Sequence, residues 1–163
     1  MHVVPIDLAS DLDSVKNVAT QAFKDSPDAS LDQWFSFLEM EKAIRANRGI
    51  CLKAVADDAE IVGMLYAQEE NPINGQEGLE KWVIVIAAVS PEKEGQGIGS
   101  ALLKEIEKQA GERGVLKMFV YTNKNDEEVI NFYKKNDYEE AGFITDYQYG
   151  KDNSAIFLLK YLR

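Results

Sequence analysis

The sequence has very few of the side chains that build disulfides, metal sites and thiol nucleophiles. It contains one cysteine, Cys51, and one histidine, His2, among 163 residues. A single cysteine allows no intrachain disulfide, so the reducing cytoplasm is the expected setting. Zinc sites are built mostly from Cys and His, and we therefore expect no metal. An activated Cys–His pair is not indicated, because His2 stands at the N-terminus and no third orienting group accompanies it.

Long apolar runs and an excess of positive charge are also missing. The apolar runs are far shorter than the ~18 residues of a membrane span, and the N-terminal residues lead directly into polar sequence. We therefore expect no membrane association and no signal peptide. The 18 Lys and Arg residues stand against 28 Asp and Glu, a net charge of −10. Phosphate backbones require clusters of basic residues, which argues against nucleic acid as a partner. The negative charge suits a cationic substrate, although solubility alone also accounts for it.

The composition that remains is that of an ordinary globular protein. The residues are 45% hydrophobic and 28% charged, which are the usual proportions of globular domains. A chain of this length buries about 70% of its unfolded surface, enough for a core without disulfides. We therefore expect one domain spanning residues 1–163.

The hydrophobic periodicity predicts alternating strands and helices. Expected strands cover residues 2–6, 50–56, 60–68, 83–89, 116–122, 138–147 and 154–161, and expected helices cover about 10–23, 31–45, 98–110 and 125–135. This order predicts an α/β (α+β) fold, a mixed and largely antiparallel sheet of six to seven strands with helices on both faces.

The chain is organised around the stretch from Val83 to Ala110. Residues 83–89 form an unbroken apolar run rich in β-branched side chains, as in a buried strand. A Ser-Pro pair ends this strand, because proline cannot donate to a ladder. Three glycines follow at positions 95, 97 and 99, and a helix then begins in which apolar residues recur every four positions.

This unit of strand, glycine turn and helix has the features of an anion site. The first N–H groups of a helix have no intrahelical partner, and the helix dipole is positive at that end. Glycines let the backbone approach a ligand closely, and phosphate is the most natural ligand. Neither the GxxxxGK[ST] loop nor the GxGxxG fingerprint fits, because the spacing is GxGxG and no Lys-Ser or Lys-Thr follows. A plain tight turn is the alternative interpretation.

The segment from Ala88 to Leu103 resembles the acetyl-CoA-binding motif of the GCN5-related N-acetyltransferases (GNAT family), Arg/Gln-x-x-Gly-x-Gly/Ala. The resemblance implies a GNAT acyl-CoA N-acyltransferase fold. It also implies that backbone N–H groups of the turn hold the pyrophosphate of coenzyme A, with the contact falling on Gly95, Gln96, Gly97, Ile98, Gly99 and Ser100. Main-chain groups of Ala88 and Val89 would bind pantetheine. Glu94 stands where the family has Arg or Gln, and its carboxylate is unfavourable beside a pyrophosphate.

A second segment, from Asn125 to Gly142, is similar to the GNAT motif Asn-x-x-Ala-x-x-x-Tyr-x-x-x-Gly-Phe. Tyr133 matches the tyrosine of that motif. Asp126 stands where the family has Asn, with Asn125 one position away. Asp137 replaces the glycine, which is tolerable because Asp visits the left-handed region more readily than most residues.

Acetyl transfer to an amine needs a proton donor for the leaving sulfur and a deprotonated amine. The resemblance implies that Tyr133 is the general acid, whereas the residues alone favour a core aromatic that shares a helix face with Phe132. Asn125 helps to hold the coenzyme or Tyr133, or else it only caps the helix. The general base is either Glu77 or Glu80, which precede the central strand, or a water relay.

The resulting prediction is an N-acetyltransferase that moves the acetyl group of acetyl-CoA to a primary amine by direct attack in a ternary complex. The expected acceptor is a cationic small molecule or a protein amine, contacted by residues 25–45, 71–78 and 142–152. Acids in the first of these segments would attract it: Asp25, Asp28, Asp32, Glu39 and Glu41. Homodimers are common in the family. Two alternatives stay open, a non-catalytic acyl-CoA-binding sensor and an interaction domain in which the glycines only form a turn.

Overall fold

A computed structural model describes residues 1–26, 30–70, 80–147 and 152–162. The elements in chain order are β1 (His2–Pro5), α1 (Leu12–Ala22), α2 (Leu31–Trp34), α3 (Phe37–Arg45), β2 (Gly49–Val55), β3 (Ile61–Glu69), β4 (Lys81–Val89), the short 3₁₀ helix η1 (Pro91–Lys93), α5 (Ile98–Glu112), β5 (Lys117–Asn123), α6 (Glu127–Lys135), β6 (Glu139–Ile144) and β7 (Ala155–Tyr161). The predicted alternation of strands and helices is therefore confirmed. No helix in the described ranges is long and apolar enough to cross a membrane.

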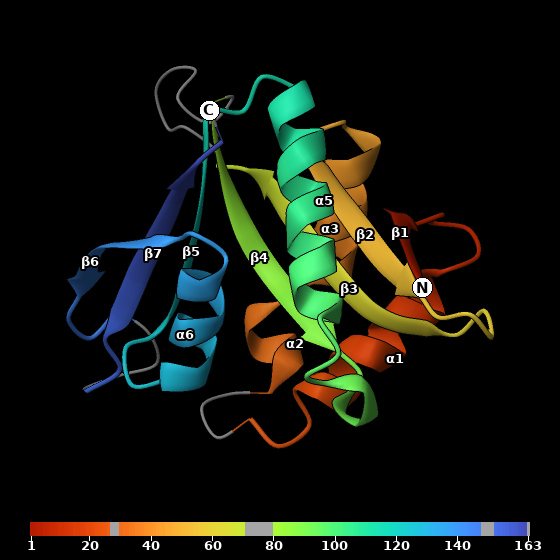
Figure 1. The fold of residues 1–163 in the computed structure, drawn as a ribbon, viewed down its shortest axis with the longest axis horizontal. Coiled ribbons are helices and arrows are strands. Elements are labelled where there is room, and N and C mark those ends of the chain that lie inside the picture. Colours follow the sequence, from red (N-terminus) through yellow and green to blue (C-terminus); the bar gives the residue numbers. More distant parts are fainter. Residues whose placement is uncertain (27–29, 71–79, 148–151, 163) are drawn as a thin grey trace.

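The seven strands form one sheet in the order β1-β2-β3-β4-β5-β7-β6. All neighbouring pairs are antiparallel except β4 and β5, which are parallel and are connected through α5. Helices cover both faces, with α5 and α6 in front of the sheet and α1 and α3 behind it in Figure 1. The predicted mixed, largely antiparallel sheet with helices on both faces is confirmed.

Each face of the sheet packs into its own hydrophobic cluster. The α5-side core consists of residues such as Leu52, Leu65, Leu102, Ile106 and Tyr133. The α1-side core consists of residues such as Val15, Met40, Cys51, Met64 and Tyr66. Because side chains alternate between the two faces of a strand, neighbouring residues of β2 and β3 enter different cores.

A bulge in β4 exchanges the two faces of that strand. Tyr66 of β3 pairs with Ile86, and the next residue, Ala67, pairs with Ile84, so Val85 is the extra residue. Before the bulge Ile84 enters the α5-side core, and after it Ile86 enters the α1-side core. One inserted residue shifts the side-chain alternation by one position, and this inverts which residues face each core.

The parallel ladder between β4 and β5 is short. It contains only the pairs Lys81–Lys117, Trp82–Met118 and Val83–Phe119. Beyond Val83, β4 continues to Val89 paired only with β3, and beyond Phe119 β5 continues paired only with β7. The sheet therefore opens between these two strands toward the end at which α5 and α6 begin, as Figure 1 shows.

The helix predicted for residues 31–45 is in fact two helices. Phe35 has an extended backbone (φ −130°, ψ 134°) and is only 7% exposed in the α1-side core. Ser36 then caps α3, because its Oγ accepts a hydrogen bond from the N–H of Glu39 at 3.3 Å. The burial of Phe35 thus interrupts the helix, although the helical periodicity of the sequence continues through the segment.

Candidate active site

The turn between β4 and α5 presents a row of N–H groups without partners. Gly95 and Gly97 have left-handed φ angles of 73° and 79°, and Gly97 is the N-cap of α5. Within the part of the chain that the structure describes, the N–H groups of residues 95–100 form no hydrogen bond. The first bond of the helix runs from the N–H of Ala101 to the carbonyl of Gly97, at 3.0 Å. Such a run of free N–H groups at a helix N-terminus is suited to binding an anion.

Glu94 lies at the border of this turn rather than inside it. Its own N–H donates to the carbonyl of Pro91 at 3.4 Å, so that group is already engaged in η1. Its side chain is exposed, as is that of Gln96. Ile98 is buried in the α5-side core and anchors the turn. Ser100 is half-buried in the first turn of the helix.

Ala88 and Val89 occupy the open end of β4, directly before the turn. The β5-facing main-chain groups of residues 84–89 have no ladder partner among the described residues. The side chain of Ala88 is buried in the α1-side core, so at this position only the main chain is available to a ligand. An extended ligand can add to such a strand through main-chain hydrogen bonds.

Tyr133 packs in the α5-side core, with a side chain that is 4% exposed. Its ring makes edge-to-face contacts with Phe132 and Tyr138, at centroid distances of 5.0 Å and 5.3 Å. Burial raises the pKa of the Tyr133 hydroxyl above its usual range, so the phenol is protonated at neutral pH. Among the described residues no hydrogen bond is formed by this hydroxyl. The packing matches the core interpretation, and the protonated hydroxyl matches a proton donor.

Glu80 is not brought to the opening. It precedes β4 at the closed end of the ladder, where its carbonyl accepts the N–H of Leu116 at 2.9 Å and its side chain is exposed. A strand rises about 3.3 Å per residue, which puts Glu80 roughly 30 Å along the strand from Val89. The other candidate base, Glu77, lies outside the described residues.

The N-cap of α6 is Asp126, so the assignment of Asn125 to the helix cap is wrong. Asp126 Oδ1 accepts the N–H of Val129 at 3.2 Å. Asn125 is exposed, and its N–H donates to Asn123 Oδ1 at 2.9 Å. An Asp cap places a negative charge at the positive end of the helix dipole, which favours it over the preceding Asn. The contact of Asn125 with the coenzyme stays a prediction.

Cys51 is unsuited to nucleophilic chemistry. It lies in β2 with 2% of its surface exposed, and burial raises the pKa of its thiol far above the usual range. A buried neutral thiol is a poor nucleophile. The described residues also contain no cluster of three or more His, Cys, Asp or Glu side chains that could hold a metal ion.

An ion pair near Tyr133 was not predicted from the sequence. Glu107 of α5 and Lys160 of β7 lie 2.8 Å apart, and Lys160 Nζ also donates to the carbonyl of Asn136 at 3.0 Å, at the end of α6. The ring of Tyr138 lies beneath the same ammonium group, 5.7 Å from its centroid. The available signal was the charge of Glu107 within the apolar stripe of α5, between Leu103 and Ala110.

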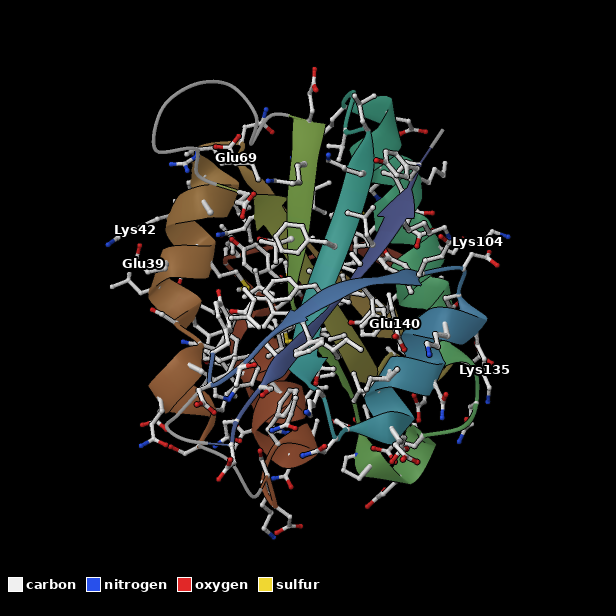
Figure 2. The ribbon with its side chains drawn as sticks, turned by 90° about the vertical axis from the view of Figure 1, so that its left-hand side faces the viewer. Glu39, Lys42, Glu69, Lys104, Lys135 and Glu140 are labelled. Carbon is white, nitrogen blue, oxygen red and sulfur yellow. The ribbon has the colours of Figure 1, made fainter. Side chains whose placement is uncertain are left out.

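Two of the acids proposed to attract the acceptor are already paired with basic residues. Glu39 pairs with Lys42 at 2.8 Å, and Glu41 pairs with Arg45 at 3.8 Å. Figure 2 shows Glu39 and Lys42 projecting outward from α3, away from the sheet. Asp25 and Asp32 are exposed, and Asp28 lies outside the described residues.

Comparison with known proteins agrees with this geometry. The sequence profile of the acetyltransferase (GNAT) family matches residues 12–138, and the chain therefore belongs to that family. No curated protein sequence matches the chain.

Several solved structures have the same fold. An aminoglycoside 6'-N-acetyltransferase complexed with coenzyme A aligns with a TM-score of 0.78 and 18% identity, covering 100% of this chain and 98% of that one. The ribosomal-protein-S18-alanine N-acetyltransferase from Escherichia coli gives 0.72 and 18%, covering 99% and 93%. An N-acetyltransferase from Staphylococcus aureus Mu50 gives 0.80 and 16%, covering 99% and 98%. At these identities the likeness shows the fold.

Proposed function

We propose that this protein transfers the acetyl group of acetyl-CoA to a primary amine. The observation that carries the proposal is the run of free N–H groups at residues 95–100, placed where β4 and β5 have separated. An anion site and an unpaired strand edge adjoin each other there. Together they fit a molecule that has a pyrophosphate and an extended, amide-bearing arm.

The chain's own residues divide the binding between them. The N–H groups of Gly95 to Ser100 would hold the pyrophosphate, and the main chain of Ala88 and Val89 would hold the pantetheine arm. The exposed carboxylate of Glu94 opposes the pyrophosphate and weakens the site. Asn125, exposed at the start of α6, would contact the coenzyme from the other strand of the opening. When bound, acetyl-CoA supplies an activated acetyl thioester.

Tyr133 is the proposed general acid for the leaving thiolate. Its raised pKa makes it a weak acid compared with a solvated phenol. Burial raises the pKa of a thiol as well, as it does for Cys51 in the α1-side core, so a buried donor and a buried acceptor are shifted in the same direction. The proton then moves between a phenol and a thiolate whose pKa values are both raised, and general acid catalysis works best when the two pKa values are close.

Deprotonation of the amine is assigned to a water relay. Glu80 stands at the closed end of the ladder, and a primary amine of Lys type has a pKa of about 10.4 and is mostly protonated at neutral pH. Because Cys51 is buried and neutral, direct attack by the amine on the thioester in a ternary complex is the route that we propose.

The acceptor is proposed to be a cationic amine. The similar solved structures are named as acetyltransferases of aminoglycosides and of a ribosomal-protein alanine, which supports an amine acceptor without selecting one. A homodimer and a cytoplasmic location remain predictions.

The decisive experiment combines calorimetric binding of coenzyme A with an acetylation screen. The protein is mixed with acetyl-CoA and a panel of amines, and free thiol is measured. Amine-dependent thiol release supports the proposal. Coenzyme binding without thiol release for any amine would instead indicate a non-catalytic acyl-CoA sensor. No binding at all would mean that the glycines only form a turn.

A further inference from the structure

The three glycines of the turn have different surroundings. At Gly95 and Gly97 the backbone is left-handed, and nothing lies within 4 Å of where a Cβ would be. Gly99 differs on both counts. It is the second residue of α5 and has a helical backbone, yet a Cβ there would lie 3.2 Å from both Cε2 and Cζ of Phe132. The family motif has Gly or Ala at this position, and in this chain it is the closeness of Phe132, and not the backbone conformation, that leaves little room for an Ala.

Phe132 connects this glycine to Tyr133. The rings of Phe132 and Tyr133 meet edge to face at 74°, and those of Tyr133 and Tyr138 meet edge to face at 68°. Tyr133 is 4% exposed and packs against both rings, so it has little free volume in which to move independently. A displacement of the half-buried Phe132 ring changes its edge-to-face contact with Tyr133.

The contact between Phe132 and Gly99 lies at the end of the sheet where β4 and β5 are no longer joined by hydrogen bonds. Helix α5 follows β4 and helix α6 follows β5, and both begin at the lower end of the sheet in Figure 1, beyond the last ladder pair. At the closed end, Lys160 of β7 lies opposite Met118 of β5, and its ion pair with Glu107 joins α5 to β7. At the open end, side-chain packing holds α5 and α6 together, because Phe132 of α6 lies against α5 at Gly99.

We propose that Phe132 is a positioning residue that sets the ring of Tyr133 relative to coenzyme held on the turn, and that Gly99 provides the space for this contact. The inference rests on the proposed function, in which Tyr133 donates the proton and the turn holds the coenzyme. It separates the two glycines: a side chain at position 97 affects coenzyme affinity, whereas a side chain at position 99 affects kcat.

The test is Gly99→Ala, which pushes the Phe132 ring away by a few tenths of an ångström. We expect kcat to fall about fourfold, because a 1 Å misplacement of a reacting group costs on the order of a hundredfold and the displacement here is a few tenths of that distance. The coenzyme Kd from calorimetry and the KM of the amine should stay within about twofold. Gly111→Ala is the matched control, since Gly111 lies in the same helix with open space around its Cβ position. It should leave kcat unchanged.

Two double variants distinguish positioning from general damage to the structure. In the Tyr133→Phe background, Gly99→Ala should cause no further fall in kcat, because no proton remains to be positioned. Combining Gly99→Ala with Phe132→Leu should restore part of the lost kcat, because the shorter side chain leaves room for the new methyl group. If Gly99→Ala fails to fold, Phe132→Leu in the parent and Tyr133→Phe backgrounds makes the same comparison.

A structural measurement completes the design. Crystal structures of the parent and of Gly99→Ala should show the Phe132 and Tyr133 rings displaced together, with the turn unchanged. Equal losses of kcat in both backgrounds, or weaker coenzyme binding at unchanged kcat, would overturn the inference. Full activity of Gly99→Ala beside a slow Tyr133→Phe would also overturn it and would leave the proposed function intact. Full activity of Tyr133→Phe would contradict both the role of Tyr133 as general acid and the role of Phe132 in positioning it.

Discussion

At the scale of single residues, the hydroxyl of Tyr133 is the atom on which the proposed chemistry depends. Tyr133→Phe keeps the ring and its contacts with Phe132 and Tyr138 but removes the proton. We expect kcat to fall by roughly 10²–10⁴-fold with coenzyme affinity nearly unchanged, which is the usual contribution of a general acid. The measurement is kcat by thiol release together with coenzyme Kd by calorimetry.

Tyr138→Phe is the natural control for that variant. The Tyr138 hydroxyl is buried and makes no hydrogen bond of acceptable geometry among the described residues, although burial and the nearby Glu107 carboxylate raise its pKa. Removing an unsatisfied buried hydroxyl is neutral or stabilising, so this variant should keep its kcat and its melting temperature should not fall. A Tyr133→Phe protein as active as the parent would contradict the assignment and would leave Tyr133 as a core aromatic.

A second residue-scale prediction concerns stability in acid. Burial raises the pKa of the Asp11 carboxyl, but hydrogen bonds from Lys53 (2.6 Å) and from the N–H of Asp7 (2.6 Å) outweigh this, so its pKa lies below the usual range. The pair therefore stabilises the fold at pH values above the unfolded pKa of about 3.9, and this contribution is lost as the pH falls through the lower folded value.

The test is Asp11→Asn, measured by urea unfolding between pH 7 and pH 3. A hydrogen bond to a charged group contributes about 1.5–3 kcal/mol, so we expect a loss of that order at pH 7 that shrinks toward pH 3. Asp13→Asn, in the exposed first turn of the same helix, should cost less. A loss for Asp11→Asn that is independent of pH would show that packing is responsible and not charge.

At the scale of elements, the glycine turn should control coenzyme affinity through its backbone. Gly97→Val puts a β-branched residue at a φ of 79°, a conformation that costs such residues on the order of 1–2 kcal/mol. The new side chain also blocks close approach of the pyrophosphate. We expect coenzyme Kd to rise at least about tenfold, measured by calorimetry on folded protein.

Gly114→Val separates these two effects. Gly114 also has a left-handed φ, 89°, and open space around it, but it lies beyond the far end of α5. Its replacement carries the same backbone strain and should lower the melting temperature while leaving coenzyme Kd unchanged. If both variants, or neither, weaken coenzyme binding, the turn is not the pyrophosphate site.

Most elements were predictable because their signals are local. The strand, glycine turn and helix from residue 81 to 112 follow from an apolar run, three glycines and a helical stripe. The break at Phe35 was not predictable, because amphipathic periodicity continues on both sides and only burial against the sheet interrupts the helix. The bulge at Val85 is hidden for a related reason: every residue nearby is apolar, so inverting the faces changes no visible pattern.

The candidate site divides in the same way. The turn at residues 95–100 was predicted from composition and spacing, and the structure shows its N–H groups without partners. The choice of Glu80 followed only from its nearness in sequence to the central strand. Glu80 precedes one end of that strand, whereas the glycine turn follows the other end. The approach of Phe132 to Gly99 depends on the packing of two helices that are far apart in sequence, and no local signal reports it.

At the scale of the whole molecule, the net charge of −10 predicts a cationic acceptor and a rate that depends on salt. Acids attract a cation at a distance, and added salt screens that attraction. We expect kcat/KM for the best amine to fall as ionic strength rises, while kcat stays nearly constant. A best substrate that is neutral or anionic, with a salt-independent kcat/KM, would contradict this. Two of the candidate acids already pair with Lys42 and Arg45, so their neutralisation should have little effect.

The three-pair ladder between β4 and β5 leaves few hydrogen bonds between two parts of the sheet, β1 to β4 and β5 to β7, and we expect these parts to behave as two units joined by a weak seam. Amide hydrogen exchange should therefore be fast for those N–H groups of residues 84–89 that point toward β5, even though the strand is central. A coenzyme lying along that edge would bridge the two units. Its addition should slow exchange on both sides of the seam at once and raise the melting temperature with ligand concentration, leaving β1 and β2 almost unaffected. Coenzyme A, on this view, completes a sheet that the polypeptide alone leaves unfinished.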